Sequence, residues 1–282
     1  MTHQRIVIIG GGNMGRAVLQ ALLHAPGVSA RQVTVVEHNP KQQKVLASEF
    51  SVQVVAELTP VTLARVTAVL VAVKPQDFSS VATQIRKYIP KNSLLISIMA
   101  GVHVSTLRSA TSCSRIVRVM PNLPMVVGEG CSAWYASRGV AKAQRVFTRA
   151  LFGAGGEQLE IHNEGMFDAI TAVSGSGPAY VFSFAADLMQ AARQLGLPAE
   201  IAKKLVLQTL KGSVALLAES SDSAEEWRAR VTSKGGTTEA AFRVLHKVRL
   251  DKLWLRALRA AARRSQAIST LIDGTIQKNK YE

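Results

Sequence analysis

The sequence predicts an α/β protein in which a doubly wound sheet domain comes first and an all-helical domain follows. Up to residue 161, short β-branched runs alternate with helical patterns. These runs are apolar throughout, as parallel strands are when helices cover both faces of their sheet. After Ile161 only helical patterns remain, and a chain of 282 residues has room for about two domains. We therefore expect domains at residues 1–161 and 162–282.

The elements of the first domain can be placed one by one. The expected strands are RIVIIG (5–10), VTVVE (33–37), AVLVAV (68–73), SLLISI (93–98), RIVRVM (115–120), CSAWY (131–135) and EQLEI (157–161). The expected helices lie near residues 13–23, 41–50, 77–89 and 140–151. Strands that alternate with helices in this way are typical of an open, mostly parallel sheet with helices on both faces.

The second domain is expected to be helical with three interruptions. The pattern breaks at Gly175–Pro178, a helix C-cap is expected at Gly196, and the stretch VTSKGGTT, residues 231–238, separates two further helices. Glycine and threonine suit any turn between helices, and this is one interpretation of VTSKGGTT. The other is an anion site, in which bare glycine backbone and the N–H groups and hydroxyls of a helix start face a ligand.

The composition is that of an ordinary globular protein, with 48% hydrophobic and 19% charged residues, but the formal net charge is +15. Many basic residues crowd the last stretch, and from 249 to 264 they share a helical pattern with apolar residues. Such a pattern indicates a helix with one packed stripe and one solvated face. Because no aromatic stacking platform or zinc finger accompanies the charge, we expect no nucleic-acid partner.

Local features argue against several other classes. Residues 169–192 are nearly apolar enough to span a bilayer, but SGSGP and Asp187 interrupt them, so no membrane segment is expected. The first residues show no signal-peptide pattern, which predicts a cytoplasmic location. Cys113 and Cys131 form no CxxC pair and have no metal-type spacing to the histidines, so neither a disulfide nor a metal site is expected.

A glycine-rich turn, GGGNMG, lies where the first expected strand ends and a helix begins. It contains Gly10-x-Gly12-x-x-Gly15. At this place the spacing is typical of a pyrophosphate cradle, because the tight turn, the close backbone approach and the helix N-terminus act together. We therefore expect Gly10, Gly12, Asn13, Met14 and Gly15 to bind a dinucleotide; the alternative is a purely structural turn.

The choice of dinucleotide depends on the end of the next strand. Glu37 lies where a carboxylate would accept hydrogen bonds from the adenosine ribose, which favours NAD over NADP. His38, Asn39 and Lys41 follow directly and are able to hold a 2′-phosphate if Glu37 turns away. We expect NAD(P)H as the cofactor, with a slight preference for NADH.

Two further turns are expected to border the nicotinamide half of the cofactor. AVKP ends one central strand and MAG ends the next. Ligands of open α/β sheets bind at the carboxyl ends of such strands. Val73, Lys74 and Ala100 are therefore further candidate cofactor residues.

Taken together, the motifs resemble those of the pyrroline-5-carboxylate reductase family. GGGNMG, AVKP, RVMPNLP (118–124), DAITAVSGSGPAY (168–180) and VTSKGGTT occur in the order found there, and the resemblance covers nearly the whole chain. It implies a Rossmann-type domain followed by a helical dimerisation domain, and a homodimer or higher homo-oligomer. It also implies hydride transfer from NAD(P)H to the C=N carbon of 1-pyrroline-5-carboxylate, which gives L-proline in the last step of proline biosynthesis.

The resemblance also implies roles for particular residues. The VTSKGGTT loop is expected to hold the substrate carboxylate through Ser233, Gly236 and Thr237, and Thr238 matches the catalytic residue whose hydroxyl meets the ring nitrogen. Glu164 matches an acidic position of the substrate site. The chain departs from the family pattern in three places: Lys234 replaces a usual proline, Arg230 replaces a neutral amide, and arginines in the last helix replace acidic residues.

Three alternatives to this function, two of them enzymes, fit part of the sequence. A β-hydroxyacid dehydrogenase of similar architecture would use a lysine in the helix that opens the second domain, but no lysine lies between Asn163 and Ala202. An imine reductase acting on another ring stays possible. From a different class, a nucleotide-sensing or nucleic-acid-binding relative would suit the charge of +15, but it would have no reason to keep the GGTT loop.

Overall fold

The computed structural model describes residues 5–278, which form two compact units. The first unit holds the chain up to Pro178 and again from Arg259, and the second holds Ala179–Leu258. The last expected strand does end next to residue 161, but the units divide elsewhere because the segment after it and the end of the chain both pack with the sheet. The division into domains 1–161 and 162–282 stays a prediction.

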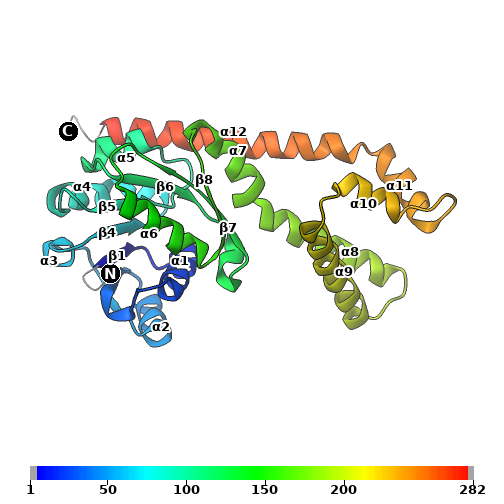
Figure 1. Cartoon of the computed structure of the whole chain (residues 1–282), viewed down its shortest axis with the longest axis horizontal. Coiled ribbons are helices and arrows are strands. Elements are labelled where there is room, and N and C mark those ends of the chain that lie inside the picture. Colours follow the sequence, from blue (N-terminus) through cyan, green and yellow to red (C-terminus); the bar gives the residue numbers. More distant parts are fainter. Residues whose placement is uncertain (1–4, 279–282) are drawn as a thin grey trace. The chain divides into compact units, whose positions relative to one another are not determined.

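The first unit contains an eight-stranded sheet of Rossmann type (Figure 1). Its strands are β1 (Ile6–Ile9), β2 (Val33–Val36), β3 (Gln53–Val55), β4 (Ala68–Val71), β5 (Leu94–Ser97), β6 (Ile116–Met120), β7 (Gly130–Ala136) and β8 (Gly156–Glu160). They lie in the order β3-β2-β1-β4-β5-β6-β7-β8. All seven expected strands are confirmed, and β3 is an additional strand that the sequence did not reveal.

Two strands, β7 and β8, run in the direction opposite to the other six. β7 pairs with β6 in antiparallel orientation, and β8 runs parallel to β7. A parallel pair needs a crossover connection of a dozen or more residues, and only the short segment 121–129 joins β6 to β7. The chain therefore turns back at this point.

Helices cover both faces of the sheet, and the alternation of the strand side chains selects the face. Ile6 and Ile8 point into a core shared with the first and sixth helices, whereas Val7 and Ile9 point into a core shared with the fourth and fifth. The helices are α1 (Asn13–His24), α2 (Pro40–Phe50), α3 (Pro60–Leu63), α4 (Phe78–Tyr88), α5 (Val104–Thr111) and α6 (Lys142–Gly153). The four expected helices are confirmed; α3 and α5 were not predicted.

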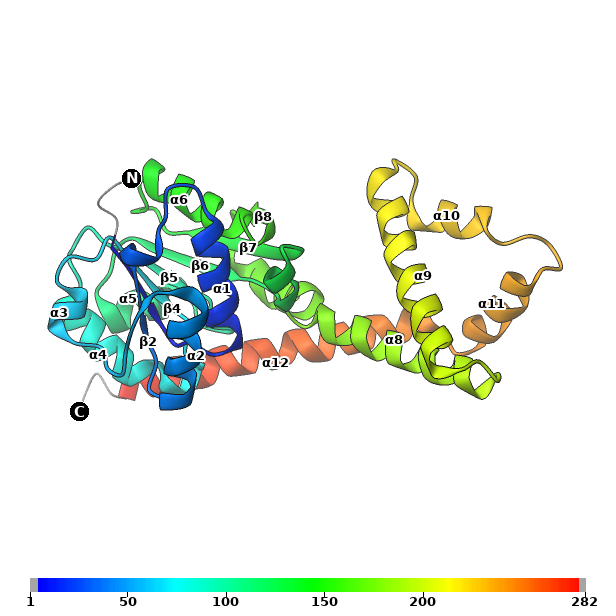
Figure 2. The same cartoon turned by 90° about the horizontal axis from the view of Figure 1, so that it is seen from below.

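The end of the chain completes the second of these cores. The long helix α12 (Leu250–Lys278) contributes Ile272 and Ile276, and it lies beside α4 and α5 (Figure 2). Its contacts are specific, because Thr106 hydrogen-bonds Asp273 and Ser265 donates to Asp168 Oδ1 at 2.7 Å. From Arg259 onward, α12 is thus part of the Rossmann-type unit.

The predicted break at Gly175–Pro178 is in fact a widened helical turn. After η4 (Glu164–Met166), the short helix α7 (Phe167–Ile170) runs into a π-helical turn over Thr171–Gly175 and then into α8 (Gly177–Gln194). The N–H of Ser176 bonds the carbonyl oxygen of Thr171 at 2.8 Å, which gives the spacing of a π turn. Glycine and proline here re-aim the helical path without ending it.

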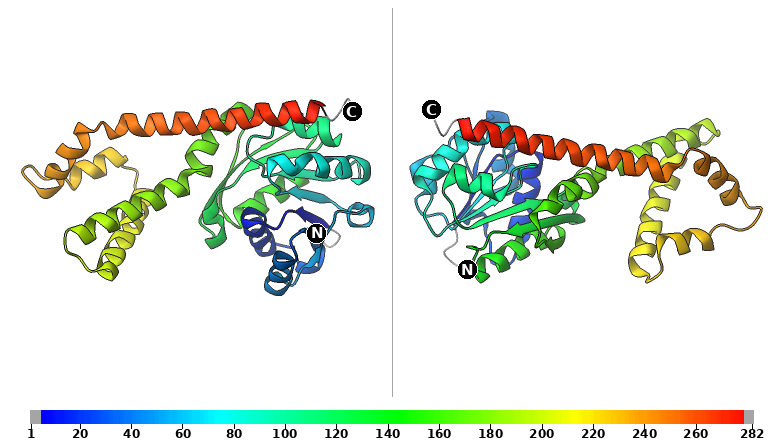
Figure 3. Two further views of the ribbon diagram at one scale, coloured as in Figure 1. Left: turned by 180° about the vertical axis from the view of Figure 1, so that it is seen from behind. Right: turned by 90° about the horizontal axis from the view of Figure 1, so that it is seen from above.

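The second unit is helical, as expected, and has little core of its own. It contains the rest of α8, α9 (Ala199–Glu219), α10 (Ala224–Arg230), α11 (Thr237–Lys247) and the start of α12 (Figure 3). Gly196 ends α8 with a φ of +93°. Only two apolar side chains of this unit, Ala185 and Ala202, are buried, whereas large exposed ones include Phe182, Phe184, Leu205, Val214, Leu217, Val244 and Trp254. So many large exposed apolar side chains on one unit are typical of a protein–protein interface.

The helices of residues 5–278 include none that combines the length and the apolar character needed to cross a bilayer. The expectation about the first residues falls partly on residues 1–4, which lie outside the described residues. The cytoplasmic location stays a prediction.

Replacing Gly101 by alanine is expected to destabilise the protein, because α12 docks directly on this residue. Gly101 has a φ of +76°, and an added Cβ would lie 2.9 Å from Ile268 Cγ2 and 3.2 Å from the nitrogen of Ser269. We expect the free energy of unfolding to fall by about 2 kcal/mol.

Gly274→Ala is the matched control for Gly101→Ala. Gly274 lies inside α12, and nothing is found within 4 Å of an added Cβ. Alanine is expected to stabilise the protein there by up to about 1 kcal/mol. Thermal denaturation of both variants gives the comparison. Equal melting temperatures would contradict the docking of α12 on Gly101.

Candidate active site

The glycine turn between β1 and α1 is tight enough to require glycine at two positions. Gly10 has a φ of +100°, and a Cβ there would lie 2.7 Å from the carbonyl oxygen of Ala72. A Cβ on Gly15 would lie only 2.0 Å from the carbonyl oxygen of Gly10. The backbone of β1, the end of β4 and the start of α1 are therefore in direct contact.

Gly12 has a different environment. An added Cβ would meet nothing within 4 Å, and both Gly12 and Asn13 are exposed. Gly12 is the N-cap of α1, a helix of 12 residues whose N-terminus no side chain caps, while Met14 packs against the core behind it. A helix N-terminus that opens onto empty space fits the pyrophosphate of a dinucleotide. The residues present thus suit the expected cofactor.

The carboxylate of Glu37 is held by backbone N–H groups. Only 7% of this residue is exposed. Its Oε2 accepts the N–H of Gly11 at 2.9 Å, and its Oε1 accepts the N–H of Asn39 at 2.8 Å. The exposed side chains next to it belong to His38, Asn39 and Lys41. The slight preference for NADH stays a prediction.

The other candidate cofactor residues lie at the same edge of the sheet. β1, β4 and β5 are parallel neighbours, so the turns that follow them meet at their carboxyl ends. Lys74 is exposed, Val73 is half-buried, and Ala100 lines a hollow of about 440 Å³. Pro75 and Gln76 also line this hollow, as do Arg264, Ile268, Leu271 and Ile272 of α12.

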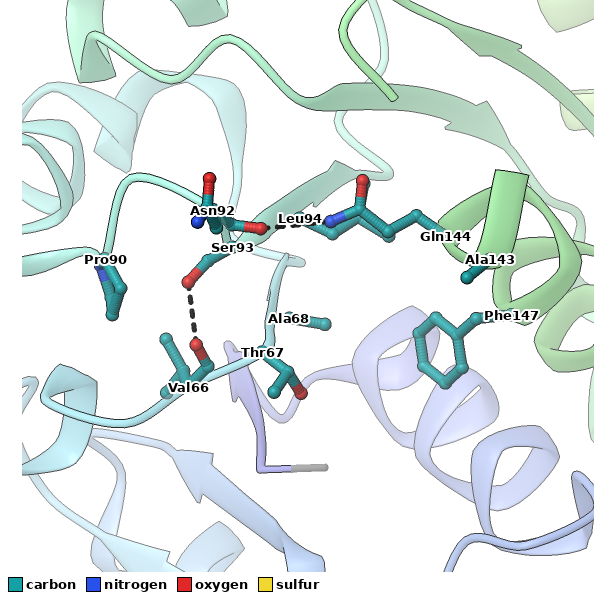
Figure 4. A pocket seen from close by; sticks show the side chains of 10 residues that line it. All are labelled: Val66, Thr67, Ala68, Pro90, Asn92, Ser93, Leu94, Ala143, Gln144 and Phe147. Carbon is teal, nitrogen blue, oxygen red and sulfur yellow. Dashed lines mark hydrogen bonds between the residues drawn. The ribbon is translucent and has the colours of Figure 1, made fainter. Parts of the chain in front are cut away.

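A second hollow, of about 290 Å³, lies at the opposite edge of the sheet (Figure 4). It is lined by the residues at the starts of β4 and β5 and by Ala143, Gln144 and Phe147 of α6. Its polar groups are already engaged, since Ser93 donates to the carbonyl oxygen of Val66 at 2.7 Å and Gln144 to that of Asn92 at 3.1 Å. None of its lining residues is titratable, and it is far from the carboxyl ends of the strands, so we assign it no chemistry.

Glu164 belongs to a partly buried polar cluster that sequence reasoning missed. Arg118, only 1% exposed, donates from Nη1 to Glu164 Oε1 at 3.0 Å and to His103 Nδ1 at 2.9 Å. The same Glu164 oxygen accepts the N–H of Val104 at 2.8 Å. The Arg118 guanidinium also lies 4.5 Å from the centre of the Phe167 ring. Because arginine only donates, His103 Nδ1 is the acceptor in this contact.

The only sequence signal for this cluster is an arginine inside an otherwise apolar strand, the RIVRVM run. In the structure, Glu164 joins the start of α5 to β6 through the cluster. One of its oxygens is thus committed to contacts within the protein. Its predicted contact with substrate stays a prediction.

The VTSKGGTT loop lies in the second unit, between α10 and α11. Gly235 has a φ of +73° with open space around it, whereas a Cβ on Gly236 would lie 2.4 Å from Ser233 Oγ. Gly235 donates its N–H to Glu239 Oε2 at 2.6 Å, so the loop backbone already holds a carboxylate. Within the described part of the chain, the hydroxyls of Ser233, Thr237 and Thr238 form no hydrogen bond.

The structure therefore brings together only part of the predicted site. The glycine turn, Val73, Lys74 and Ala100 lie at one edge of the first unit, and Glu164 is in the same unit. The residues of the VTSKGGTT loop belong to the second unit. Of the two departures near the loop, Lys234 is exposed, and Arg230 pairs with Asp222 at 2.7 Å and lies over the Trp227 ring.

Metal-ligating side chains and the two cysteines add no further candidate site among the described residues. Over residues 5–278, no cluster of three or more His, Cys, Asp and Glu side chains has the arrangement to hold a metal ion. Cys113 and Cys131 are free thiols. Burial raises the pKa of the Cys113 thiol above its ordinary value, although a hydrogen bond with Thr111 opposes the shift, so Cys113 is a poor nucleophile at neutral pH.

Arg118→Ala is expected to destabilise the protein by about 3 kcal/mol, because it leaves the Glu164 carboxylate and a buried space without their partner. The matched control is Arg108→Ala on α5, an exposed arginine, for which we expect a change within about 0.5 kcal/mol. Urea denaturation gives both values. Similar midpoints for the two variants would show that the cluster does not hold α5 and β6 together.

Comparison with known proteins supports this combination of features. The family described as "Pyrroline-5-carboxylate reductase dimerisation" matches residues 164–268, and the one described as "NADP oxidoreductase coenzyme F420-dependent" matches residues 5–101. Among solved structures, Plasmodium falciparum pyrroline carboxylate reductase with NADP bound superposes with a TM-score of 0.86 at 29% identity, covering 95% of this chain and 99% of that one.

Sequence relatives agree along the whole length. The pyrroline-5-carboxylate reductase of Pseudomonas aeruginosa is 36% identical, covering 95% of this chain and 98% of the relative. That of Pasteurella multocida is 37% identical, covering 96% and 100%. With this identity over nearly full length, and the fold and glycine turn described above, the chain belongs to the pyrroline-5-carboxylate reductase family.

Proposed function

We propose that this protein reduces 1-pyrroline-5-carboxylate to L-proline with NAD(P)H. Two features of one chain of this family carry the proposal. The first is a glycine turn at the N-terminus of α1 that no side chain caps, and the second is a loop in which the hydroxyls of Ser233, Thr237 and Thr238 form no bond within the described residues. The first suits a dinucleotide and the second suits a small carboxylate. A protein that only sensed nucleotides would need the first and not the second.

The chemistry asks little of ionisable side chains. A protonated cyclic imine is already electrophilic, and the nicotinamide supplies the hydride, so the protein has mainly to position the two groups. The N-terminus of α1 would hold the pyrophosphate, and the ends of β4 and β5 would border the nicotinamide. The loop would hold the substrate carboxylate through Ser233, Gly236 and Thr237. The N–H of Gly235, which donates to Glu239 at 2.6 Å, supports a carboxylate in this position.

Thr238 is assigned the catalytic contact with the ring nitrogen. It is the second residue of α11, and its hydroxyl is not used within the described residues, so it is available to a ligand. Glu164 is proposed as an acidic neighbour of the substrate through its second oxygen, Oε2.

The active form is proposed to be a homodimer or a higher homo-oligomer. The apolar side chains exposed on α8, α9 and α11 support this, because a second copy of the chain would bury them. Nucleic acid and membranes are not proposed as partners.

An assay of NADH and NADPH oxidation tests the function directly. We expect oxidation only when 1-pyrroline-5-carboxylate is added, and a panel of other cyclic imines separates this activity from that of a general imine reductase. Cofactor binding without turnover at any substrate concentration would contradict the proposal.

Gly12→Ala is expected to weaken NADPH binding by about tenfold or more, because its Cβ would occupy the space assigned to the pyrophosphate. The melting temperature should not change, since Gly12 has a φ of −65° and an added Cβ meets no atom within 4 Å. Gly153→Ala, where the nearest atom to the new Cβ is 3.8 Å away at the end of α6, is the control for both measurements. Unchanged affinity in Gly12→Ala would move the pyrophosphate elsewhere.

Thr238→Ala is expected to lower kcat/KM by roughly ten- to a hundred-fold, which corresponds to the loss of about 1 to 3 kcal/mol of transition-state stabilisation. Thr238→Ser keeps the donor and should stay close to wild type. Thr232→Ala is the control within the same loop, since its hydroxyl bonds the carbonyl oxygen of Arg228 at 2.7 Å. A lower melting temperature with kcat/KM retained would assign Thr238 to the turn alone.

A further inference from the structure

One residue of the glycine turn, Gly11, is not among the three glycines of the Gly10-x-Gly12-x-x-Gly15 pattern. Gly11 is buried, although it lies next to the exposed Gly12. Its N–H donates to Glu37 Oε2 at 2.9 Å, and its carbonyl oxygen accepts from Gln42 Nε2 at 2.9 Å. Both polar backbone groups of this residue are therefore held by side chains from the end of β2 and the start of α2.

Glu37 is itself fixed in this orientation. Besides the contact of its Oε1 with Asn39, its carbonyl oxygen accepts from Gln43 Nε2 at 2.6 Å, and its N–H donates to the carbonyl oxygen of Val55 at 2.9 Å. Turning the side chain outward would leave the buried N–H of Gly11 without an acceptor, which is costly.

The space around Gly11 is narrow. A Cβ on Gly11 would lie 2.4 Å from Leu46 Cδ1 and 3.1 Å from Glu37 Oε2. A side chain on Gly11 would thus have to displace the ends of the Leu46 and Glu37 side chains. This separates Gly11 from Gly12, beside which the space is open.

We propose that Glu37 and Gln42 are positioning residues, which hold Gly11 and thereby fix the turn that presents Gly12 and the N-terminus of α1 to the pyrophosphate. In this role Glu37 does not read the adenosine ribose. The inference rests on the proposed function, since it takes the turn to be the dinucleotide site. A carboxylate beneath this turn repels an anion, so the benefit of Glu37 comes from its hydrogen bonds and not from its charge.

The test compares two ligands that lack nicotinamide, ADP-ribose and its 2′-phosphorylated form, by calorimetry on the full-length protein. Glu37→Gln keeps the shape of the side chain but replaces one acceptor by a donor, so at least one of the two N–H contacts is lost. We expect both ligands to bind about tenfold more weakly, by the same factor. Gln42→Ala should weaken both in the same direction, and this second variant serves if Glu37→Gln does not fold.

Glu57→Gln, which changes an exposed carboxylate between β3 and α3, is the matched control and should bind both ligands as wild type does. Opposite changes in Glu37→Gln, weaker for ADP-ribose and tighter for the 2′-phosphorylated form, would show that Glu37 faces the ribose and would overturn the proposal. Unchanged or tighter binding of both ligands would overturn it as well, because then the hydrogen bonds do not matter.

Hydrogen exchange at the Gly11 amide gives a second readout that needs no ligand. We expect exchange in Glu37→Gln to be at least about tenfold faster than in wild type, with the amides of α6 unchanged. Unchanged protection of Gly11 would overturn the proposal. If wild-type protein binds neither ligand while Glu37→Gln does release the Gly11 amide, the proposed function has failed and the hydrogen-bonded support of the turn has not.

Discussion

Direct contact between bare backbone segments at the carboxyl end of β1 is the constraint on which the first unit depends. Gly10 lies against the carbonyl oxygen of Ala72, and Gly15 lies against the carbonyl oxygen of Gly10. A side chain at either place would push α1 away from β1 and β4. Because the N-terminus of α1 is the proposed anion site, its position follows from this contact and from the way Glu37 and Gln42 hold Gly11. The site is thus built from backbone, and side chains serve mainly to fix that backbone.

Much of the fold was predictable because its signals are local. Apolar runs and the glycine spacing depend on neighbours in sequence, so seven strands, four helices and the turn were found. β3 has only three residues, exposed or half-buried, and therefore gives no clear apolar run. The reversal at β7 depends on a connection length, and the return of α12 to the sheet depends on contacts between residues far apart in sequence. Neither leaves a local pattern.

In the candidate site, too, local signals were predictable and contacts between distant residues were not. The positions of Gly12, Lys74 and Ala100 at strand ends followed from the topology. The orientation of Glu37 did not, because an acidic residue at the end of a strand has the same spacing whether it turns outward or inward. Only the hydrogen bonds with Gly11 and Asn39 distinguish the two. Arg118 was missed for a related reason: a buried arginine is acceptable only when its partners are present, and those partners come from distant segments.

The place of α12 has a consequence for how the protein is made. The apolar face that includes Val7, Ile9 and Leu107 is completed by Ile272 and Ile276 near the end of the chain. A ribosome releases Ile272 and Ile276 only after the helical segment Ala179–Leu258 has been synthesised. This apolar face of the nascent sheet therefore stays exposed to solvent while the helical segment is translated. During that time the chain is prone to aggregate and can bind chaperones. Closure of the sheet domain thus follows synthesis of the helical segment, although most of the sheet domain is encoded before it.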